Sequence, residues 1–395
     1  MKEHTHLETI SRLKNAFSHQ YGENSKKITI VSAPCVLNLL GGDYTEHEDG
    51  FSLLATGQHR VYIAAQVRTD RQAMVYSLNY DEKFSSPLGS LKFEKMDGWA
   101  NYPKGILYFY ERMGRKLEGI QLAVLNEIPE QMCLKEMAAL NMAVAFTCNV
   151  LGTRPLDDAT LVKLSQRVET QFLQIHGDYY SPFASRFGKQ NHLVIFDPRS
   201  FKPDYVPFDH DQVKLVVIDS GVRNKSNVEQ EFNKRLEVFQ QLLNEVRKHV
   251  PKILTLRDLT PDLYETARKR IDILMRKRLD YIVFENHRVQ KSKEFLIKGD
   301  YLGFGALLNE SQDALAEKLK ITCPEIDILS QICRKSGCLG ARMAGMGWGG
   351  TMICLVKTAQ IQPFIDQVQR DYKNQVNISP QCYIYDAGDG IQKEE

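Results

Sequence analysis

Residues 33–50 read APCVLNLLGGDYTEHEDG, an apolar run followed by a cluster of acidic and histidine side chains. The strand-like run Ile28–Ser32 leads into it without a break. Short apolar runs bounded by glycine and acidic residues are typical of strands. We therefore expect the end of a strand here, followed by a loop that carries five acidic or histidine side chains.

A second stretch, residues 337–350, reads GCLGARMAGMGWGG. It holds too many glycines for the interior of a helix, and glycine permits a positive φ and a close approach of the backbone to a ligand. Taken alone, the stretch fits a tight turn equally well. It leads into the apolar run Thr351–Val356, which we expect to form a strand.

The remaining pattern predicts an α/β (α+β) chain in two parts. The first part has helical periodicity over 7–19, 101–114, 134–151 and 158–175, and strand patterns over 62–67, 73–78, 121–125 and 193–197. The second part has strand patterns over 214–219 and 381–385, and helical patterns over 228–248, 260–277, 279–297, 300–318, 324–336 and 359–373. The polar segment 200–212 lies between them, which predicts one domain over 1–207 and another over 208–395.

The composition argues against several classes of function. The 395 residues carry a formal net charge of only +2, so no overall field attracts nucleic acid or an acidic membrane. No apolar run is long enough to span a bilayer, and the N-terminal residues lack the apolar core of a signal peptide. The eight cysteines form no CxxC pair and the ten histidines show no zinc-type spacing. We expect a cytoplasmic protein with reduced cysteines and no metal site.

Two Arg-Lys-Arg runs, at 268–270 and 276–278, could mark a nucleic-acid patch. Asp272 and Asp280 are interspersed with them, and no aromatic cluster accompanies them. This mixture favours a solvated helix face.

Together the two opening stretches resemble the first and last motifs of the galactokinase branch of the GHMP sugar-kinase superfamily, A-P-G-R-V-N-L-I-G-E-H-T-D-Y-N-x-G and G-A-R-M-T-G-x-G-x-G-G. Segments between them are also similar, among them WANYPKGILYF, PFASRFGKQNH, DSGVRNKSNVEQEFNKR and ENHRV, so that the resemblance runs from about residue 28 to 390. It implies an N-terminal ribosomal-S5-domain-2-like domain, a C-terminal GHMP α+β domain and an active-site cleft between them. It also implies transfer of the γ-phosphate of ATP, with Mg²⁺, to the anomeric hydroxyl of galactose or a relative.

The phosphate loop departs from this family pattern. The family's P-x-G-x-G-L-S-S-S-A-A falls on 129–139, where Gln131 and Cys133 replace both glycines, and the first two serines become Lys135 and Glu136. Backbone N–H groups at such a helix N-terminus form an anion cradle. We hypothesise that Glu136 replaces the nucleotide's anion at that helix end. Lys135 argues the other way, because a lysine can bind phosphate as a point charge.

The catalytic pair of the family is also replaced. Val36 stands at the position of the family's arginine, and Ser181 at the position of its aspartate base. Asp178 lies three residues earlier and is a possible substitute. Because Pro182 is suited to the first turn of a helix, we expect Asp178 on the preceding loop, pointing elsewhere.

The remaining candidate residues follow from the same resemblance. Gly345 and Gly347 persist at nucleotide-site positions, where they can also be purely structural. The acidic loop could contact a polyol or be a charged surface loop. The candidates for sugar contact are Asn38, Asp43, Glu46, His47 and Phe232, the last standing where the family has tyrosine.

Two functions remain open. The first is a galactokinase-like protein that is catalytically impaired or inactive and that acts as a sugar-binding or regulatory protein, with an unidentified protein partner and no firm cofactor. The second is an active sugar or sugar-derivative kinase with a rebuilt phosphate site, which would use MgATP. In both, a small-molecule sugar is the expected ligand.

Overall fold

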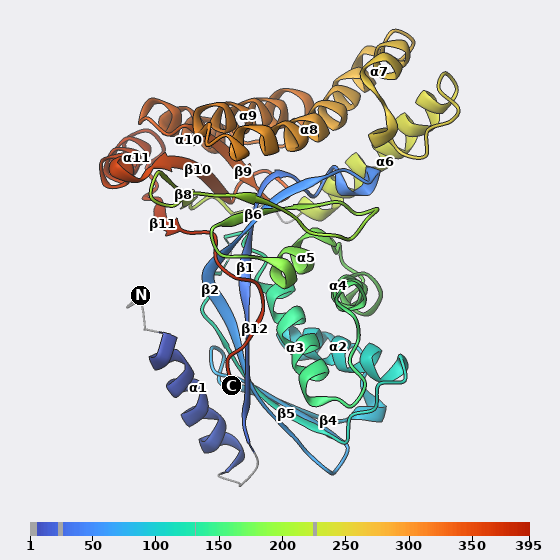
Figure 1. Ribbon diagram of the computed structural model, residues 1–395, viewed down its shortest axis with the longest axis vertical. Coiled ribbons are helices and arrows are strands. Elements are labelled where there is room, and N and C mark those ends of the chain that lie inside the picture. The colour runs from blue at the N-terminus through green and yellow to red at the C-terminus, as the bar shows by residue number, and fades with distance from the viewer. Residues whose placement is uncertain (1–5, 23–26, 131, 224–226) are drawn as a thin grey trace.

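Two β-sheets organise the chain (Figure 1), and the computed structural model describes residues 6–22, 27–130, 132–223 and 227–395. The larger sheet has the order β12-β1-β2-β5-β3-β4, and β6 pairs with both β2 and β7. The smaller sheet has the order β11-β8-β10-β9. The strands of the larger sheet are β1 (Thr29–Gly41), β2 (Ser52–Val67), β3 (Gln72–Ser77), β4 (Glu82–Pro87), β5 (Ile120–Asn126), β6 (His192–Phe196), β7 (Asp204–Pro207) and β12 (Gln392–Lys393). Those of the smaller sheet are β8 (Val213–Asp219), β9 (Gly340–Ala344), β10 (Thr351–Lys357) and β11 (Gln381–Tyr385).

Helices cover both faces of the larger sheet. On one face lies α1 (His6–Tyr21), whose Leu13 and Phe17 pack against Ile30 and Leu125 of the sheet (Figure 1). The other face carries α2 (Asn101–Arg112), α3 (Glu136–Leu151), α4 (Asp158–Arg167) and α5 (Tyr180–Phe187). Because α3 lies between strand β1 and the other helices, it is apolar almost all round and ten of its residues are buried.

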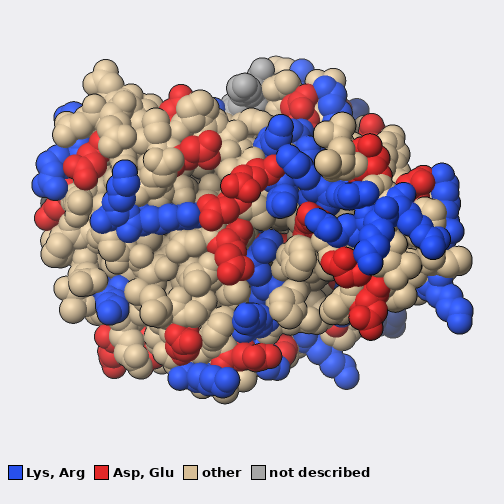
Figure 2. Space-filling model, turned by 90° about the horizontal axis from the view of Figure 1, so that it is seen from above, with Lys and Arg blue, Asp and Glu red and all other residues tan. Residues whose placement is uncertain are grey.

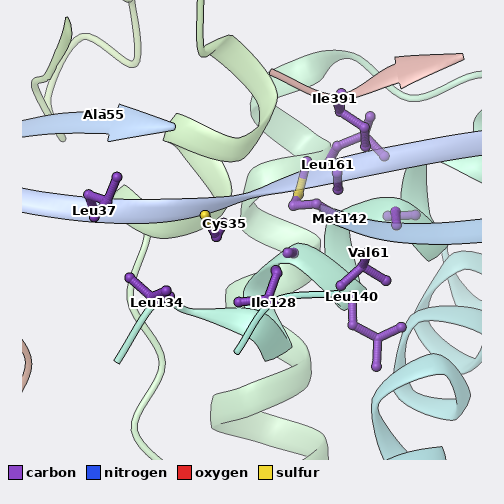
Figure 3. Close-up of a cluster of buried hydrophobic side chains, with 14 of the residues drawn as sticks. Cys35, Leu37, Ala55, Val61, Ile128, Leu134, Leu140, Met142, Leu161 and Ile391 are labelled. Atoms are coloured by element: carbon purple, nitrogen blue, oxygen red, sulfur yellow. The ribbon is translucent and has the colours of Figure 1, made fainter. Parts of the chain in front are cut away.

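The contact between α3 and the sheet keeps the helix in place although its N-terminal loop has changed. Figure 3 shows Leu134 and Met142 beside strand β1, which carries Cys35 and Leu37. Burial of one such side chain contributes about 1.5–3 kcal/mol. The apolar contacts of α3 and of the loop before it therefore hold the helix on the sheet whatever polar residues the loop carries.

The smaller sheet is covered by the C-terminal helices, which lie at the top of Figure 1. They are α6 (Val228–Arg247), α7 (Pro261–Arg268), α8 (Ile273–Ile297), α9 (Tyr301–Ala314), α10 (Pro324–Lys335) and α11 (Ile361–Val376). A second core, which includes Phe239, Leu329 and Phe364, fills the space between these helices and the sheet. The two sheets with their own helix layers form the two-domain α/β architecture that the sequence predicts.

A buried polar network joins β1 to the C-terminal helices. Glu285 of α8 is fully buried and its Oε1 accepts a hydrogen bond of 2.9 Å from the N–H of Gly41. Arg342 donates to the carbonyl of Gly41 over 3.0 Å and lies 3.5 Å from Glu285. Burial opposes ionisation of Glu285, but Arg288 and Arg342 hold its pKa below the usual value. The end of β1, and with it the acidic loop, is thus fixed from both halves of the chain.

Most predicted elements are confirmed, and four predictions need correction. The strand at Ile28 continues to Gly41, so less of the stretch 33–50 is loop than expected. The break between helices 260–277 and 279–297 falls at residues 269–272, because Asp272 caps α8 by accepting a hydrogen bond from the N–H of Leu274. Helix 158–175 ends as an α-helix at Arg167 and continues as one π turn. The glycine-rich stretch contains strand β9, where Gly340 packs directly on Gly305.

The surface charges of the C-terminal helices are mixed. In Figure 2, which looks down on them, acidic side chains lie among the lysines and arginines. Arg268 lies 3.5 Å from Asp280, and Arg276 donates to the carbonyl of Ile271 at a helix end. These contacts agree with the interpretation of the basic runs as a solvated helix face. Across the described ranges, each helix is too short or too polar to span a lipid bilayer.

Candidate functional site

The loop before α3 keeps an unusual backbone although its glycines are gone. Cys133 and Lys135 both have positive φ, at 52° and 59°. Such angles are uncommon for residues other than glycine and cost of order 1–3 kcal/mol each. The loop therefore holds two non-glycine residues in a backbone conformation that glycine adopts more readily. Gln131, the other replaced glycine position, lies outside the described residues.

This loop is closed by contacts from both domains. The carbonyl of Leu134 accepts a hydrogen bond of 3.0 Å from the N–H of Val36. The hydroxyl of Thr351 donates to the carbonyl of Met132 over 2.7 Å. A Cβ atom at Gly345 would lie only 2.9 Å from the sulfur of Cys133, so the glycine-rich hairpin packs directly on the loop. The backbone of the loop is therefore held by the protein on both sides, while Cys133 and Lys135 stay partly exposed.

Lys135 projects from this loop and bridges two carboxylates. Its Nζ lies 3.1 Å from Asp43 and 3.1 Å from Asp178, and it sits over the ring of Tyr180 at 4.9 Å. The hydroxyl of Tyr180 donates to Asp43 over 2.7 Å. Burial works against both charged partners, but mutual attraction raises the pKa of Lys135 well above its usual value and lowers the pKa of Asp43. Lys135 is therefore a permanently charged, internally paired cation.

The position of Asp178 corrects the expectation that it points elsewhere. Helix α5 begins at Tyr180 and not at Pro182, so Asp178 is close to its start. One carboxylate oxygen accepts a 2.7 Å hydrogen bond from the N–H of Ser181, and the other faces Lys135. Asp178 is thus held at the centre of the site.

Two further glutamates stand beside this bridge. Glu46 accepts hydrogen bonds from the N–H groups of Tyr179 and Tyr180 at 2.7 and 3.3 Å, and burial together with Asp178 raises its pKa well above the usual value. Burial and Asp178 also raise the pKa of Glu169 to about 8. At neutral pH the side chain of Glu169 is mainly protonated. The site therefore holds two carboxyl groups with raised pKa values next to the two aspartates that are paired with Lys135.

Aromatic rings form the other wall of the site. His176 lies between His47 and Phe232, with ring centroids 5.4 and 4.5 Å away. Phe232 of α6 is fully buried and also contacts Tyr44 at 4.7 Å. Burial lowers the pKa of His176, so the ring is held in its neutral form. The acidic loop, the α5 entry and a C-terminal helix meet here.

Other predicted residues border this cluster with their side chains in the protein interior. Val36 and Ser181 are both fully buried, and Val36 packs in an apolar cluster with Tyr180 and Phe183. Asn38 is turned inward and donates to the carbonyl of Gly41 over 3.1 Å. A Cβ atom at Gly347 would lie 2.5 Å from the carbonyl oxygen of Ile321, which gives that glycine a packing role.

Glu136 begins α3 and faces a different space. It lines a small cavity with Tyr80, Trp99 and Met137, whose volume is about 20 Å³. A cavity of this size holds about one water molecule. Burial raises the pKa of Glu136. The helix N-terminus is thus occupied by a carboxyl group in a nearly filled space.

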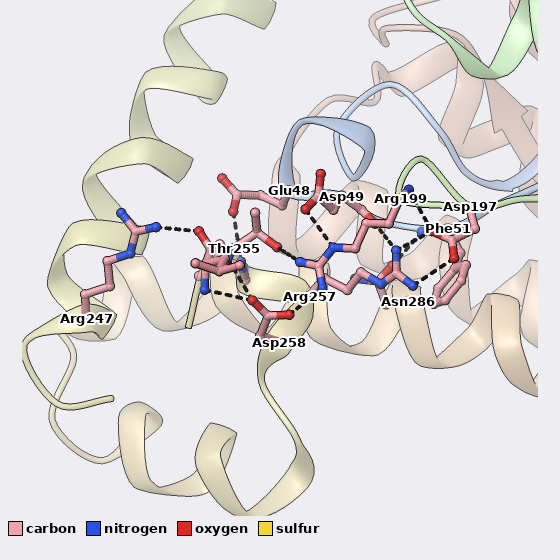
Figure 4. Close-up of polar contacts among 12 residues, drawn as sticks. Glu48, Asp49, Phe51, Asp197, Arg199, Arg247, Thr255, Arg257, Asp258 and Asn286 are labelled. Carbon is pink, nitrogen blue, oxygen red and sulfur yellow. Dashed lines mark hydrogen bonds and ion pairs between the residues drawn. The ribbon is translucent and has the colours of Figure 1, made fainter. Parts of the chain in front are cut away.

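A polar network outside the cluster holds the acidic loop in place (Figure 4). Arg199 bonds Asp49 and Asp258 at 2.8 and 2.7 Å. Arg257 donates to the carbonyl of Asp49 over 2.9 Å. The carboxylate of Glu48 accepts a hydrogen bond of 2.9 Å from the N–H of Leu256. Loop residues 48 and 49 are therefore tied to the C-terminal half of the chain, and this part of the loop is not a free surface loop.

Several site members were not recognised from the sequence. Tyr180, His176 and Glu169 are not part of the motifs from which the candidate residues were predicted. An aspartate such as Asp178 is favoured just before a helix, and Tyr180 lies two residues after it. This is the one local signal that Tyr180 lies near the acidic loop. In the described ranges, no group of three or more histidine, cysteine, aspartate or glutamate residues is arranged to hold a metal ion.

Comparisons with known proteins agree with this architecture. Residues 292–374 match the family model "GHMP kinases C terminal", and residues 15–67 match the "Galactokinase galactose-binding signature". The chain is 28% identical to a galactokinase of Clostridium beijerinckii, covering 98% of this chain and 100% of the relative. It is 29% identical to a galactokinase of Glaesserella parasuis, covering 97% and 99%. The structure of Lactococcus lactis galactokinase complexed with galactose superposes with a TM-score of 0.91, at 25% identity, over 98% of this chain and 100% of that one.

The two sheets and the C-terminal family match make the chain similar in architecture to the GHMP small-molecule kinases. A mevalonate kinase shares this fold with a TM-score of 0.59 at 15% identity. The chain is galactokinase-like along its whole length.

Proposed function

We propose that this chain is a galactokinase-like sugar-binding protein that has lost most or all of its phosphoryl-transfer activity. The observation that carries the proposal is the bridge from Lys135 to Asp43 and Asp178, at 3.1 Å each. The one cation that entered the phosphate loop is neutralised by two carboxylates. It is therefore a poor partner for an anionic nucleotide.

The surroundings of the α3 N-terminus do not fit a magnesium triphosphate. A triphosphate needs free backbone N–H groups at a helix start, and it needs carboxylates only as ligands of its metal ion. Here the loop is closed by Thr351 and Gly345, and Glu136 occupies the first helical position. A carboxylate about 4 Å from a phosphate would repel it by roughly 1–4 kcal/mol, depending on the effective dielectric. The site is therefore not suited to phosphoryl transfer from MgATP.

A sugar ligand is supported by the aromatic and acidic composition of the site. Polyhydroxylated ligands are bound by carboxyl groups that accept hydrogen bonds and by aromatic faces that cover apolar C–H groups. Asp43 and Glu46 supply carboxyl groups and His47 an aromatic ring, and the buried ring of Phe232 lies behind His47 at 6.1 Å. The Lactococcus lactis relative was solved with galactose, which makes a hexose the first ligand to test.

The domains follow the sheets in this proposal. Strand β7 ends at Pro207 and pairs with β6 of the larger sheet, whereas β8 begins at Val213 in the smaller sheet. We place the boundary between residues 207 and 208. Strand β12 then returns from the C-terminal part to pair with β1.

An active kinase with a rebuilt site is the second candidate, favoured by the inward position of Asp178. This carboxylate could act as the base, with Lys135 contacting the phosphate. A coupled ADP-release assay across hexoses separates the two functions. Turnover that disappears in Lys135→Ala and Asp178→Asn would establish the kinase. Heat released on titration with galactose, without turnover and without a response to MgATP, would establish the binding protein.

A further inference from the structure

A second cavity lies far from the interdomain site, at the opposite end of α3. Its volume is about 320 Å³, and it is lined by Tyr110, Gly114, Arg115, Lys116, Thr153 and Arg154. These residues come from the turn after α2 and from the loop after α3. Helix α3 has 16 residues, so its two ends are separated by about 24 Å. The cavity is at the lower limit of the size range of small-molecule sites.

Three cationic side chains line this cavity, and in the part of the chain that the structure describes only Lys116 has a carboxylate, that of Glu111, near enough to interact with it electrostatically. Within the described ranges, Arg115, Lys116 and Arg154 form no side-chain hydrogen bond and no ion pair. The Nε atom of Arg115 is buried and has no acceptor. Buried polar atoms in native proteins are nearly always hydrogen-bonded, so an orphaned guanidinium N–H calls for an explanation.

The nearest carboxylate is already engaged elsewhere. Glu111 accepts two hydrogen bonds from Arg71, at 2.9 and 2.7 Å, and a third from the N–H of Leu117 at 3.1 Å. Arg71 is the first partner that lowers the pKa of Glu111, and Lys116 lowers it further. Glu111 is therefore shared between Arg71 and Lys116, and it forms no ion pair with Arg115 or Arg154. Carbonyl groups at the C-terminal ends of α2 and α3 also attract cations. The carbonyl of Cys148, near the end of α3, already accepts hydrogen bonds from the hydroxyl of Tyr110 and the N–H of Gly152.

The chemistry of the lining selects the class of ligand. No carboxylate lines the cavity, which argues against a metal ion or an amine. Arginine presents a planar fork and lysine a compact charge, and both bind phosphate oxygens strongly. The hydroxyl of Thr153 adds one neutral donor. We propose that this cavity binds a phosphate-bearing small molecule through Arg115, Lys116 and Arg154, independently of the sugar site.

The test is calorimetric titration of the full chain with two probes, inorganic phosphate and glucose 6-phosphate, at low ionic strength. The double variant Lys116→Gln/Arg154→Gln removes two exposed cations and leaves the half-buried Arg115 in place, so the fold should persist. We expect saturable binding by the unmodified chain and at least tenfold weaker binding by the double variant. Tighter binding of the ester than of phosphate would extend the site to the sugar body, whereas equal binding would confine it to the phosphate group.

Two controls keep the test specific. Lys252→Gln/Lys298→Gln removes the same amount of charge at exposed positions elsewhere and should leave binding unchanged. Saturating galactose, which addresses the interdomain site without changing the chain, should also leave the binding of both probes unchanged. The proposal is overturned if neither probe binds saturably, if the Lys116/Arg154 variant binds as tightly as the unmodified chain, or if galactose abolishes binding.

Discussion

Substitution of Lys135 by methionine tests the bridge at the centre of the site. The change keeps most of the side-chain volume but removes the charge between Asp43 and Asp178. Asp43 is almost fully buried, with 3% of its side chain exposed, whereas Lys135 keeps 21%. Removing one partner of a buried ion pair costs about 3–5 kcal/mol, because the remaining charge is left without compensation. Since Lys135 is partly exposed, we expect the free energy of unfolding to fall by an amount near the lower end of this range, about 3 kcal/mol at pH 7.

The pH dependence of that loss identifies its cause. In the unmodified chain the lowered pKa of Asp43 contributes stability that is present above the carboxyl's usual pKa and is lost as pH falls through the lower, folded-state pKa. Without Lys135, burial dominates and raises the pKa of Asp43, so the variant gains stability as pH falls. The difference between the two proteins should therefore narrow from pH 7 to pH 4 in urea denaturation.

A matched control is the exposed pair formed by Lys14 and Glu395, whose atoms are 2.6 Å apart. Lys14→Met should change the free energy of unfolding by only about 0–1 kcal/mol, as for other surface pairs. The bridge does not stabilise the buried Asp43 and Asp178 if Lys135→Met lowers the free energy of unfolding no more than Lys14→Met does, and if this loss does not vary with pH.

Three further predictions concern neighbouring residues. The pKa of Glu169 is raised to about 8, so the folded chain binds a proton that the unfolded chain releases near pH 4.5, and the contribution of Glu169 to stability falls as pH rises from about 4.5 to 8. Glu169→Gln should therefore reduce the pH dependence of the free energy of unfolding over this range, measured by urea denaturation. An unchanged pH dependence would exclude Glu169 as its source. Glu136→Ser should strengthen any residual affinity for MgATP severalfold in calorimetry, whereas Glu130→Ser should not, and equal affinities would refute the role of Glu136. Gly345→Ala should lower the melting temperature, because its φ of 87° is unfavourable for alanine and its Cβ would lie 2.9 Å from Cys133; an unaltered melting temperature would show that the hairpin is not packed on the loop.

Most of the fold could be predicted because its elements have strong local patterns. Helices α3 and α10 and strands β8 and β10 show regular apolar spacing, and their predicted limits agree with the structure within two residues. Strand β4 was missed because its sequence EKFSSP is polar and mostly exposed at a sheet edge. Strand β9 was missed because its two flanking glycine clusters dominate the pattern, although the strand itself is fully buried.

The candidate site could be predicted only in part, because it is assembled from distant segments. The replacements at Val36, Ser181 and Lys135 are visible in the sequence. The direction of Asp178 is not, since it depends on where α5 begins and on Glu46, which binds the N–H groups of residues more than 130 positions later. The contact between Phe232 and His176 likewise joins two domains. Long-range contacts of this kind leave no local signal.

The direct test of the account is calorimetric titration of the unmodified chain with MgATP, in the presence and absence of saturating galactose. The account predicts no saturable heat at millimolar MgATP, because the loop before α3 is closed and its one cation is paired with Asp43 and Asp178. A dissociation constant in the micromolar range, abolished by Lys135→Ala, would contradict it.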